Sequence, residues 1–362
     1  MPWPGRGHIN PMMNLCKRLV LRDLNLIVTF VVTEEWLGFI GSDPKPDRIR
    51  FSTLPNLIHS ELVRANNFNG FVDAVHTLLE EPFERLLDGL NSPPPTVIIS
   101  DTYVVWAVRV GEQRNIPVVS FWTMSATILS LFLHSDLLIS HDHALFEPSE
   151  LSVENKRSKP DYIRWLDGQA KSSVLYISQG SFLSVSEAQM EEIVAGVRES
   201  GVPFLWVARG GESKMKEALE GSSGFVVSWC DQLRVLCHAA LGGFWTHCGF
   251  NSTLEGMYSG VPMLAFPLHW DQILNGKMIV EEWRVGMKIE RRKKTELLID
   301  REEIKEVVKR LMDRESEEGK EMRRRACDVS EICRGAVAEK GSSDANIDAF
   351  IRDINNRGFC QN

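Results

Sequence analysis

The sequence predicts an α/β protein with two halves, each built on a mainly parallel sheet. Three observations support this fold class. The 362 residues exceed one typical domain and suit two. Short apolar segments alternate with helical segments along the whole chain. The apolar segments are continuous runs, such as LIVTFVV (26–32) and VPMLAF (261–266), which indicates strands covered on both faces.

The first half, residues 1–150, contains four predicted strands: 26–32, 48–54, 96–100 and 117–121. One helix is expected to begin near Pro11, because proline is favoured in a first helical turn, and another to cover about 69–89. The chain opens on the glycine-rich stretch GRGHINP (5–11) with no strand before it, whereas such a loop normally follows a strand. We therefore expect the first domain to be incomplete.

The second half, residues 171–342, is richer in strands. These are predicted at 173–178, 203–208, 224–228, 242–246, 261–266 and 285–289, with helices at 186–200, 272–283, 301–315 and 319–335. The mixed charges of the last two helices indicate solvated faces. The polar stretch within 151–170 is expected to be a linker, and residues 343–362 to carry a separate C-terminal helix at about 343–355.

Composition excludes several classes of protein. With 43% apolar and 25% charged residues the chain is neither disordered nor a disulfide scaffold, and a net charge of −8 predicts no nucleic-acid partner. Seven cysteines without a C-x-x-C, and a start that lacks an apolar leader, predict a cytoplasmic protein with reduced thiols. The uncharged stretch 116–133 is interrupted by proline, serine and threonine, which favours a buried strand and helix over a membrane span.

The segment Gly242–Pro267 is typical of a strand, a turn, a helix and a further strand. Asn251 and Ser252 fit the N-cap and first turn of that helix, and Glu255 follows in the next turn. A helix N-terminus at the carboxyl end of a parallel strand binds anions, and His247 beside it could donate to a phosphate oxygen. Helix capping without a ligand explains this segment equally well when it is taken alone.

A longer window of 44 residues, Trp229 to Gln272, carries a more specific signal. It opens with W-x-x-Q, holds H-C-G-x-N-S-x-x-E in its middle and ends in D-Q. This window resembles the signature box of the plant family-1 UDP-glycosyltransferases. The resemblance implies the GT-B architecture, in which two Rossmann-like domains face each other across a cleft. The second domain would hold a UDP-sugar and the first the acceptor, with the C-terminal helix crossing back.

The resemblance also implies roles for individual positions. The UDP-sugar would be held by Trp229, Cys230, Gln232, His247, Gly249, Phe250, Asn251, Ser252, Glu255, Asp271 and Gln272, with Ser181 as a further phosphate contact. Trp229 would stack on uracil, Glu255 would accept from the ribose hydroxyls, and Asp271 and Gln272 would bind the sugar. The family usually has tryptophan where this chain has Phe250, so the sugar is less firmly indicated, although Gln272 favours glucose.

The acceptor side of the reaction is implied by the first half. His8 resembles the family's general base, Asp101 the carboxylate that orients it, and Thr123 a residue near the sugar. The reaction implied is an inverting transfer of a hexose to a hydroxyl of a small secondary metabolite, such as a flavonoid, another phenolic or a terpenoid. No cofactor is expected, since the UDP-sugar is a co-substrate, and the absence of an Asp-x-Asp motif argues against a metal.

Two other functions are compatible with parts of this sequence. An NAD-dependent enzyme is disfavoured because the third glycine of G-x-G-x-x-G is replaced by Asn10. A truncated, non-catalytic variant that retains only UDP-sugar binding stays open, because family members are longer and the stretch at about 146–159 is shorter than usual. The sequence does not decide the acceptor or the oligomeric state.

Overall fold

The computed structural model describes residues 1–61, 67–90, 94–133, 160–179, 185–208, 212–289 and 298–358. These residues form two compact units. Unit 1 contains Met1–Thr123 together with the C-terminal Ala336–Asn362, and unit 2 contains Val153–Gly335. Helix α6 (Ala126–Leu133) groups with unit 2.

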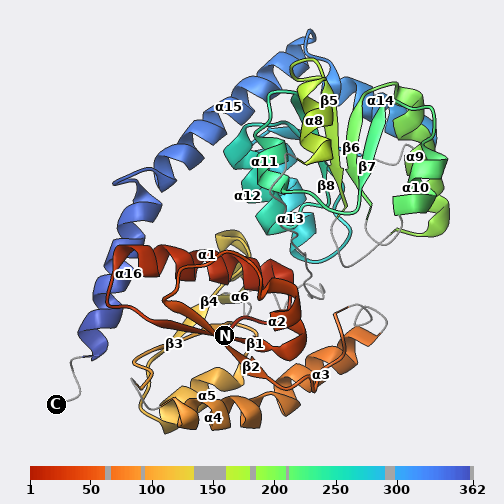
Figure 1. Cartoon of the computed structure of the whole chain (residues 1–362). Coiled ribbons are helices and arrows are strands. Elements are labelled where there is room, and N and C mark those ends of the chain that lie inside the picture. The colour runs from red at the N-terminus through yellow and green to blue at the C-terminus, as the bar shows by residue number, and fades with distance from the viewer. Residues whose placement is uncertain are drawn as a thin grey trace. The chain divides into compact units, whose positions relative to one another are not determined.

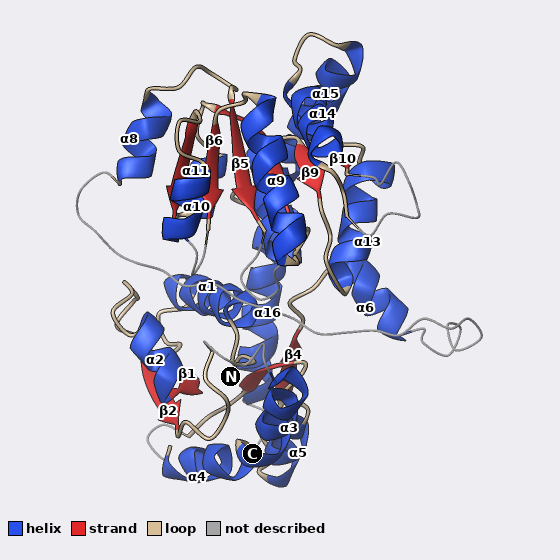
Figure 2. Cartoon of the chain, turned by 90° about the vertical axis from the view of Figure 1, so that its right-hand side faces the viewer, coloured by secondary structure: helices blue, strands red, loops and turns tan. Residues whose placement is uncertain are grey.

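Unit 1 holds two separate parallel strand pairs, seen as red arrows in Figure 2. Its elements are α1 (Arg6–Arg22), β1 (Val28–Thr33), α2 (Glu34–Ile40), β2 (Ile49–Leu54), α3 (Phe68–Leu78), α4 (Glu80–Gly89), β3 (Ile98–Asp101), α5 (Trp106–Gln113), β4 (Val118–Phe121) and α16 (Ser342–Gly358). β1 pairs with β2, and β3 pairs with β4. Met1 lies beside β3: its amino group donates to the Ile99 carbonyl at 2.5 Å, and its carbonyl accepts from the Asp101 N–H at 2.9 Å.

The two faces of β1 pack into different parts of the unit 1 core. Phe30 and Val32 pack with side chains of α1 and α2, whereas Val31 packs with side chains of α3 and α4. This alternation follows from the period of two along a strand and confirms the interpretation of the apolar run as a doubly covered strand. α16 lies against α1, where Arg22 forms ion pairs with Asp344 and Asp348.

Two helix predictions in unit 1 are corrected by the structure. α1 begins at Arg6 rather than near Pro11, so GRGHINP forms the start of a helix and not an open loop; Gly5 is its N-cap, and the Gly5 carbonyl accepts from His8 and Ile9. The helix expected at 69–89 is two helices, α3 and α4, with Leu79 between them. Pro82 stands in the first turn of α4, because a proline there has no N–H to donate to the preceding turn.

Unit 2 is built on a six-stranded sheet in which every pair is parallel. The strands are β5 (Val174–Ser178), β6 (Phe204–Val207), β7 (Gly224–Val227), β8 (Leu241–Thr246), β9 (Met263–Ala265) and β10 (Gly286–Lys288). Their order is β10-β9-β8-β5-β6-β7, so the chain leaves β5 in one direction through β6 and β7 and returns to its other side with β8. This reversal between β5 and β8 is the topological switch point at which open α/β sheets bind ligands.

Helices cover both faces of this sheet, as Figure 1 shows. The helices of unit 2 are α6, α8 (Asp161–Asp167), α9 (Glu187–Ser200), α10 (Glu212–Ala218), α11 (Gln232–Leu236), α12 (Phe250–Ser259), α13 (Asp271–Lys277), the π-helix η2 (Met278–Glu282), α14 (Arg301–Met312) and α15 (Glu317–Val337). Tyr176 of β5 packs in one core cluster with α8, α11 and η2, while Leu175 and Ile177 pack in the other with α9 and α14. The alternation again places apolar side chains on both faces.

Three boundaries in unit 2 differ from the sequence predictions. α8 is a helix within the stretch expected to be a linker at 151–170; residues 151–159 lie outside the described residues. α12 begins at Phe250 with Gly249 as its N-cap, so Asn251 is not the cap but lies in the first turn. The helix expected at 272–283 is α13 followed directly by η2. None of the helices described in the structure is long and apolar enough to cross a membrane.

Candidate functional site

The turn between β8 and α12 lies at the carboxyl end of a strand that borders the switch point. Cys248 has a φ of 66°, a left-handed conformation, and its N–H donates to Thr246 Oγ1 at 3.0 Å. A Cβ at Gly249 would stand 2.4 Å from Nε2 of His247, so a larger residue here would displace this imidazole. The tight turn therefore sets His247 next to the N-terminus of α12, where the first N–H groups of a helix face an incoming anion.

The segment Trp229–Gln232 follows β7 and leads into α11. Asp231 caps α11 by accepting the Arg234 N–H at 3.1 Å, and the hydroxyl of Tyr162 accepts the N–H of Asp231 at 3.1 Å. The segment is thus held by its backbone from two sides. Trp229 is only partly buried, and a partly exposed indole offers a face on which a nucleobase can stack.

A network of side chains joins this segment to α12. Nε2 of Gln232 donates to Ser252 Oγ at 3.0 Å and to Glu255 Oε2 at 2.6 Å. Oε1 of Gln232 accepts from the hydroxyl of Tyr176 at 3.0 Å, and that hydroxyl lies 3.3 Å from Sγ of Cys230. The structure therefore brings together four of the residues that the sequence predicted for the donor, Cys230, Gln232, Ser252 and Glu255.

The carboxyl group of Glu255 has a raised pKa. Desolvation by burial is the largest cause, the nearby Asp231 adds to it, and the hydrogen bond from Gln232 opposes it. A carboxyl group in this setting is short of hydrogen-bond donors, and a vicinal diol supplies two. The arrangement suits recognition of a ribose.

Asp271 and Gln272 lie at the start of α13 and are both buried. Oε1 of Gln272 accepts from the N–H groups of Leu268 at 2.9 Å and His269 at 3.1 Å, so its Nε2 is the end of the amide left for a ligand. Oδ2 of Asp271 accepts from Nδ2 of Asn275 at 2.8 Å. The same Nδ2 donates to the carbonyl of Cys248 at 2.9 Å, which ties this pair to the turn after β8.

In unit 1 the two predicted catalytic residues meet directly. Nδ1 of His8 lies 2.7 Å from Oδ2 of Asp101, and both residues are 2% exposed. Thr123 Oγ1 stands 3.1 Å from the same nitrogen, and Asp101 Oδ1 accepts from the N–H of Tyr103 at 3.0 Å. A proton on Nδ1, donated to the carboxylate, leaves the lone pair on Nε2, which accepts no hydrogen bond from the described residues.

Several residues that support the site were not predicted from the sequence, and one predicted residue lies outside the described part of the chain. Tyr176, Tyr162 and Asn275 were not singled out, although a tyrosine within the apolar strand SVLYIS was a signal, because a buried hydroxyl needs a partner. Ser181 lies outside the described residues. Phe250 and Asn251 lie in the first turn of α12, close in sequence to Ser252.

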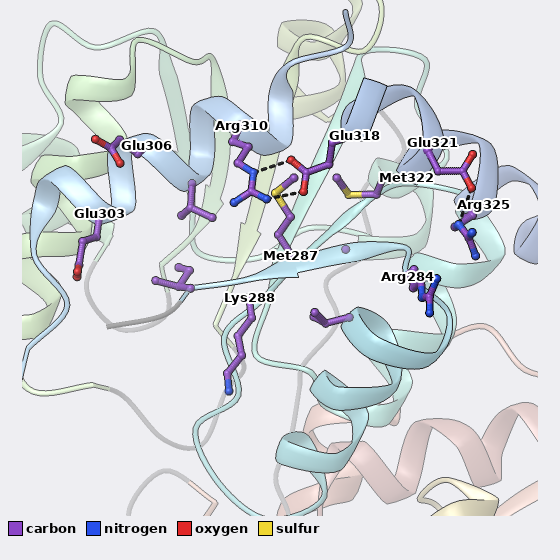
Figure 3. Close-up of a pocket in the computed structure, with 14 residues that line it drawn as sticks. Arg284, Met287, Lys288, Glu303, Glu306, Arg310, Glu318, Glu321, Met322 and Arg325 are labelled. Carbon is purple, nitrogen blue, oxygen red and sulfur yellow. Dashed lines mark hydrogen bonds and ion pairs between the residues drawn. The ribbon is translucent and has the colours of Figure 1, made fainter. Parts of the chain in front are cut away.

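A pocket of about 690 Å³ lies elsewhere in unit 2, beside β10, and is shown in Figure 3. Its lining carries four glutamates and four basic residues, and the pairs Arg310–Glu318 and Arg325–Glu321 neutralise part of that charge. It shares no lining residue with the predicted donor site. Within the described ranges no group of three or more His, Cys, Asp or Glu side chains could hold a metal ion.

Comparisons with known proteins point to one family. A family model described as UDP-glucoronosyl and UDP-glucosyl transferase matches residues 152–323. UDP-glycosyltransferase 87A2 of Arabidopsis thaliana is 67% identical over 437 aligned positions, which cover 98% of this chain and 96% of the relative. UDP-glycosyltransferase 87A1 of the same plant is 63% identical over 98% of this chain and 99% of its own length.

Among solved structures, UGT2 of Phytolacca americana, complexed with UDP-2-fluoro-glucose and pterostilbene, aligns with a TM-score of 0.82 at 24% identity and covers 97% of both chains. This likeness confirms the fold expected from the sequence, GT-B with its two Rossmann-like units. The 437 positions aligned with the first relative exceed the 362 residues of this chain, so part of that relative has no counterpart here. The stretch expected to be shortened, 146–159, lies outside the described residues.

Proposed function

The chain belongs to the plant family-1 UDP-glycosyltransferases, and from this premise we propose that it transfers a sugar from a UDP-sugar to a hydroxyl of a small plant metabolite. The observation that carries the proposal is the network of Gln232, Ser252 and Glu255 in unit 2, on segments that follow the carboxyl ends of β7 and β8. Two of its members lie on α12, whose N-terminus suits a diphosphate.

Each part of the donor has a matching group. Trp229 stacks on the uracil, and Glu255 accepts hydrogen bonds from the ribose hydroxyls. The diphosphate is held by His247 and by the N–H groups in the first turn of α12, with Asn251 and Ser252 beside it. Charge that develops on the leaving UDP is stabilised by the same helix terminus.

Glucose is the sugar we propose. Gln272 presents its Nε2 as a donor, because its Oε1 is already occupied by two backbone N–H groups, and Asp271 supplies an acceptor nearby. The pair can therefore bind neighbouring sugar hydroxyls with complementary polarity. UGT2 of Phytolacca americana is complexed with UDP-2-fluoro-glucose, which supports the same class of donor.

The base in unit 1 is His8. Asp101 holds the imidazole through Nδ1, which leaves Nε2 to remove the proton from the acceptor hydroxyl. The acceptor oxygen then forms a bond to the anomeric carbon while the bond to the UDP oxygen breaks, so the configuration at that carbon inverts. The imidazolium formed is stabilised by the Asp101 carboxylate.

We propose a flavonoid, another phenolic or a terpenoid as the acceptor. The supporting observation is the pterostilbene complex of UGT2 of Phytolacca americana, a relative in fold. We further propose that no metal takes part, since the sequence contains no Asp-x-Asp. Turnover is then expected to be unchanged in excess chelator.

The proposal is tested by UDP release from UDP-glucose with a panel of hydroxylated plant metabolites. His8→Ala should lower kcat by about 10² to 10⁴, the usual contribution of a general base, while UDP still binds. His238→Ala is the matched control, because it breaks a His–Asp contact of 3.3 Å to Asp167 in unit 2, whereas the proposed base belongs to unit 1. Product analysis by NMR gives the anomeric configuration.

The outcomes distinguish an active glycosyltransferase from a non-catalytic variant that only binds UDP. Turnover that is lost in His8→Ala and kept in His238→Ala supports the enzyme. UDP binding without turnover on any acceptor in the wild type would favour the non-catalytic variant, and turnover that survives His8→Ala would contradict the role of His8.

A further inference from the structure

Tyr176 is buried in the middle of β5, and its ring stacks on Phe244 at 5.2 Å between centroids. Its hydroxyl lies 3.0 Å from Oε1 of Gln232 and 3.3 Å from Sγ of Cys230, and it also bonds with the side chain of Ser178 at the end of β5. A buried phenol needs such partners, and two of these are side chains of the Trp229–Gln232 segment.

The hydrogens of this network can be assigned one by one. The single hydroxyl proton of Tyr176 is donated to Oε1 of Gln232, so the phenol oxygen is left to accept from its other neighbours, the S–H of Cys230 and the hydroxyl of Ser178. Burial raises the pKa of Tyr176 well above its ordinary value, so this proton stays in place. Both hydrogens on Nε2 of Gln232 are then directed at Ser252 and Glu255.

The opposite orientation of the Gln232 amide is disfavoured by the same contacts. After a flip, Oε1 would face the carboxylate oxygen of Glu255 at 2.6 Å, acceptor against acceptor, and the hydrogen bond that Oε1 accepts from the hydroxyl of Tyr176 would be lost. Tyr176 and Glu255 therefore favour the same orientation of the amide, Tyr176 from inside the sheet. The amide in turn holds the carboxylate of Glu255 and the hydroxyl of Ser252 in fixed positions.

We propose that Tyr176 is a positioning residue for nucleotide recognition: its hydroxyl fixes the Gln232 amide so that Glu255 is presented to the ribose hydroxyls of UDP. This inference rests on the proposed function, since it assigns a support to the same donor site. Tyr176 itself touches no substrate in this scheme. Its loss should reduce the contribution of the ribose to binding more than it reduces the binding of the rest of the nucleotide.

The test is calorimetric binding of UDP and of 2′-deoxy-UDP to the full chain, in the wild type, Tyr176→Phe and Tyr162→Phe. Tyr176→Phe keeps the ring that stacks on Phe244 and removes only the hydroxyl. Tyr162→Phe is the matched control: it loses a tyrosine hydroxyl that accepts from the Asp231 N–H of the same segment and leaves the Gln232 amide bonded. Thermal unfolding of each variant checks the fold.

In the wild type, 2′-deoxy-UDP should bind about 10-fold or more weakly, since a hydrogen bond to a charged group is lost. The ratio of the two dissociation constants, 2′-deoxy-UDP over UDP, measures this discrimination. Tyr176→Phe should lower the ratio at least about threefold, because it weakens the binding of UDP more than that of the deoxy analogue. Tyr162→Phe should keep the ratio within about twofold of the wild type. A ratio in Tyr176→Phe equal to that of the control would overturn the proposal. A wild type that binds no UDP would instead contradict the proposed function.

A second variant keeps the test decisive if Tyr176→Phe does not fold. Replacing Tyr176 by 4-aminophenylalanine keeps a donor N–H at the position of the hydroxyl. The discrimination between UDP and 2′-deoxy-UDP should then stay within about twofold of the wild type, because the amide is still oriented. Loss of the discrimination in a folded 4-aminophenylalanine variant would overturn the role assigned to the hydroxyl proton.

Discussion

At the scale of single residues, the environment of Glu255 links the fold to binding. Burial raises the pKa of this carboxyl above its ordinary 4.5, and only the ionised form can accept both hydroxyls of a ribose. UDP affinity should therefore fall as the pH is lowered through the raised pKa, at a higher pH than an ordinary glutamate would require. Titration calorimetry between pH 5 and about 8 measures this loss.

The same raised pKa has an opposite effect on stability. The folded state binds the Glu255 proton more firmly than the unfolded state, so the favourable contribution is present below pH 4.5 and is lost as the pH rises through the folded pKa. Glu255→Gln should remove the pH dependence of UDP affinity and that of folding stability, because the amide does not titrate. A variant that retained the wild-type loss of UDP affinity at low pH would show that another group is responsible.

The cysteines provide a second prediction at this scale. Burial raises the pKa of the Cys248 thiol to about 12 and that of Cys16 to about 11, whereas Cys237 and Cys327 are exposed. Iodoacetamide at pH 8 should therefore label Cys237 and Cys327 and leave Cys16 and Cys248 unmodified, as peptide mass mapping will show. Rapid labelling of Cys248 in folded protein would contradict the structure of the turn after β8.

At the scale of elements, the sequence located the strands better than the helix ends. All ten predicted strands are present, because a run of apolar residues flanked by polar turns has few other structures open to it. The residues at which helices begin were predicted less accurately. α1 starts at Arg6, after the N-cap Gly5, rather than near Pro11, and Leu79 divides α3 from α4, because backbone geometry and the nearby Pro82 decide those ends.

The contact between α9 and α14 gives a prediction at this scale. A Cβ at Gly196 of α9 would lie 2.7 Å from the Arg301 carbonyl oxygen and 2.7 Å from Ile304 of α14, so the two helices would have to separate. Gly196→Ala should lower the free energy of unfolding by about 1–3 kcal/mol despite the better helix propensity of alanine. Urea unfolding followed by circular dichroism measures the change.

Gly335 in the last turn of α15 is the matched control, because a Cβ there would meet nothing within 4 Å. Gly335→Ala should leave stability unchanged or raise it by up to about 1 kcal/mol. Equal stability of Gly196→Ala and the wild type would mean that α9 and α14 are farther apart than the structure has them.

At the scale of the whole molecule, the family resemblance pointed to candidate site residues but not to the way they are supported. Gln232 and Glu255 of the window from Trp229 to Gln272 are hydrogen-bonded to each other, and so are His8 and Asp101, which the resemblance placed together. The supports came from elsewhere: Tyr176 from β5 and Tyr162 from α8 are distant in sequence. Contacts of this kind depend on strand order, which no local pattern specifies.

The central claim is that unit 2 binds a uridine nucleotide through the window from Trp229 to Gln272. Isothermal titration of the full chain with UDP tests it most directly, with Glu255→Ala measured beside the wild type. The account predicts one UDP bound per chain and an affinity lowered at least about tenfold in the variant, because its ribose acceptor is gone. No uptake of UDP by folded wild-type protein, or equal affinity in the two proteins, would contradict it.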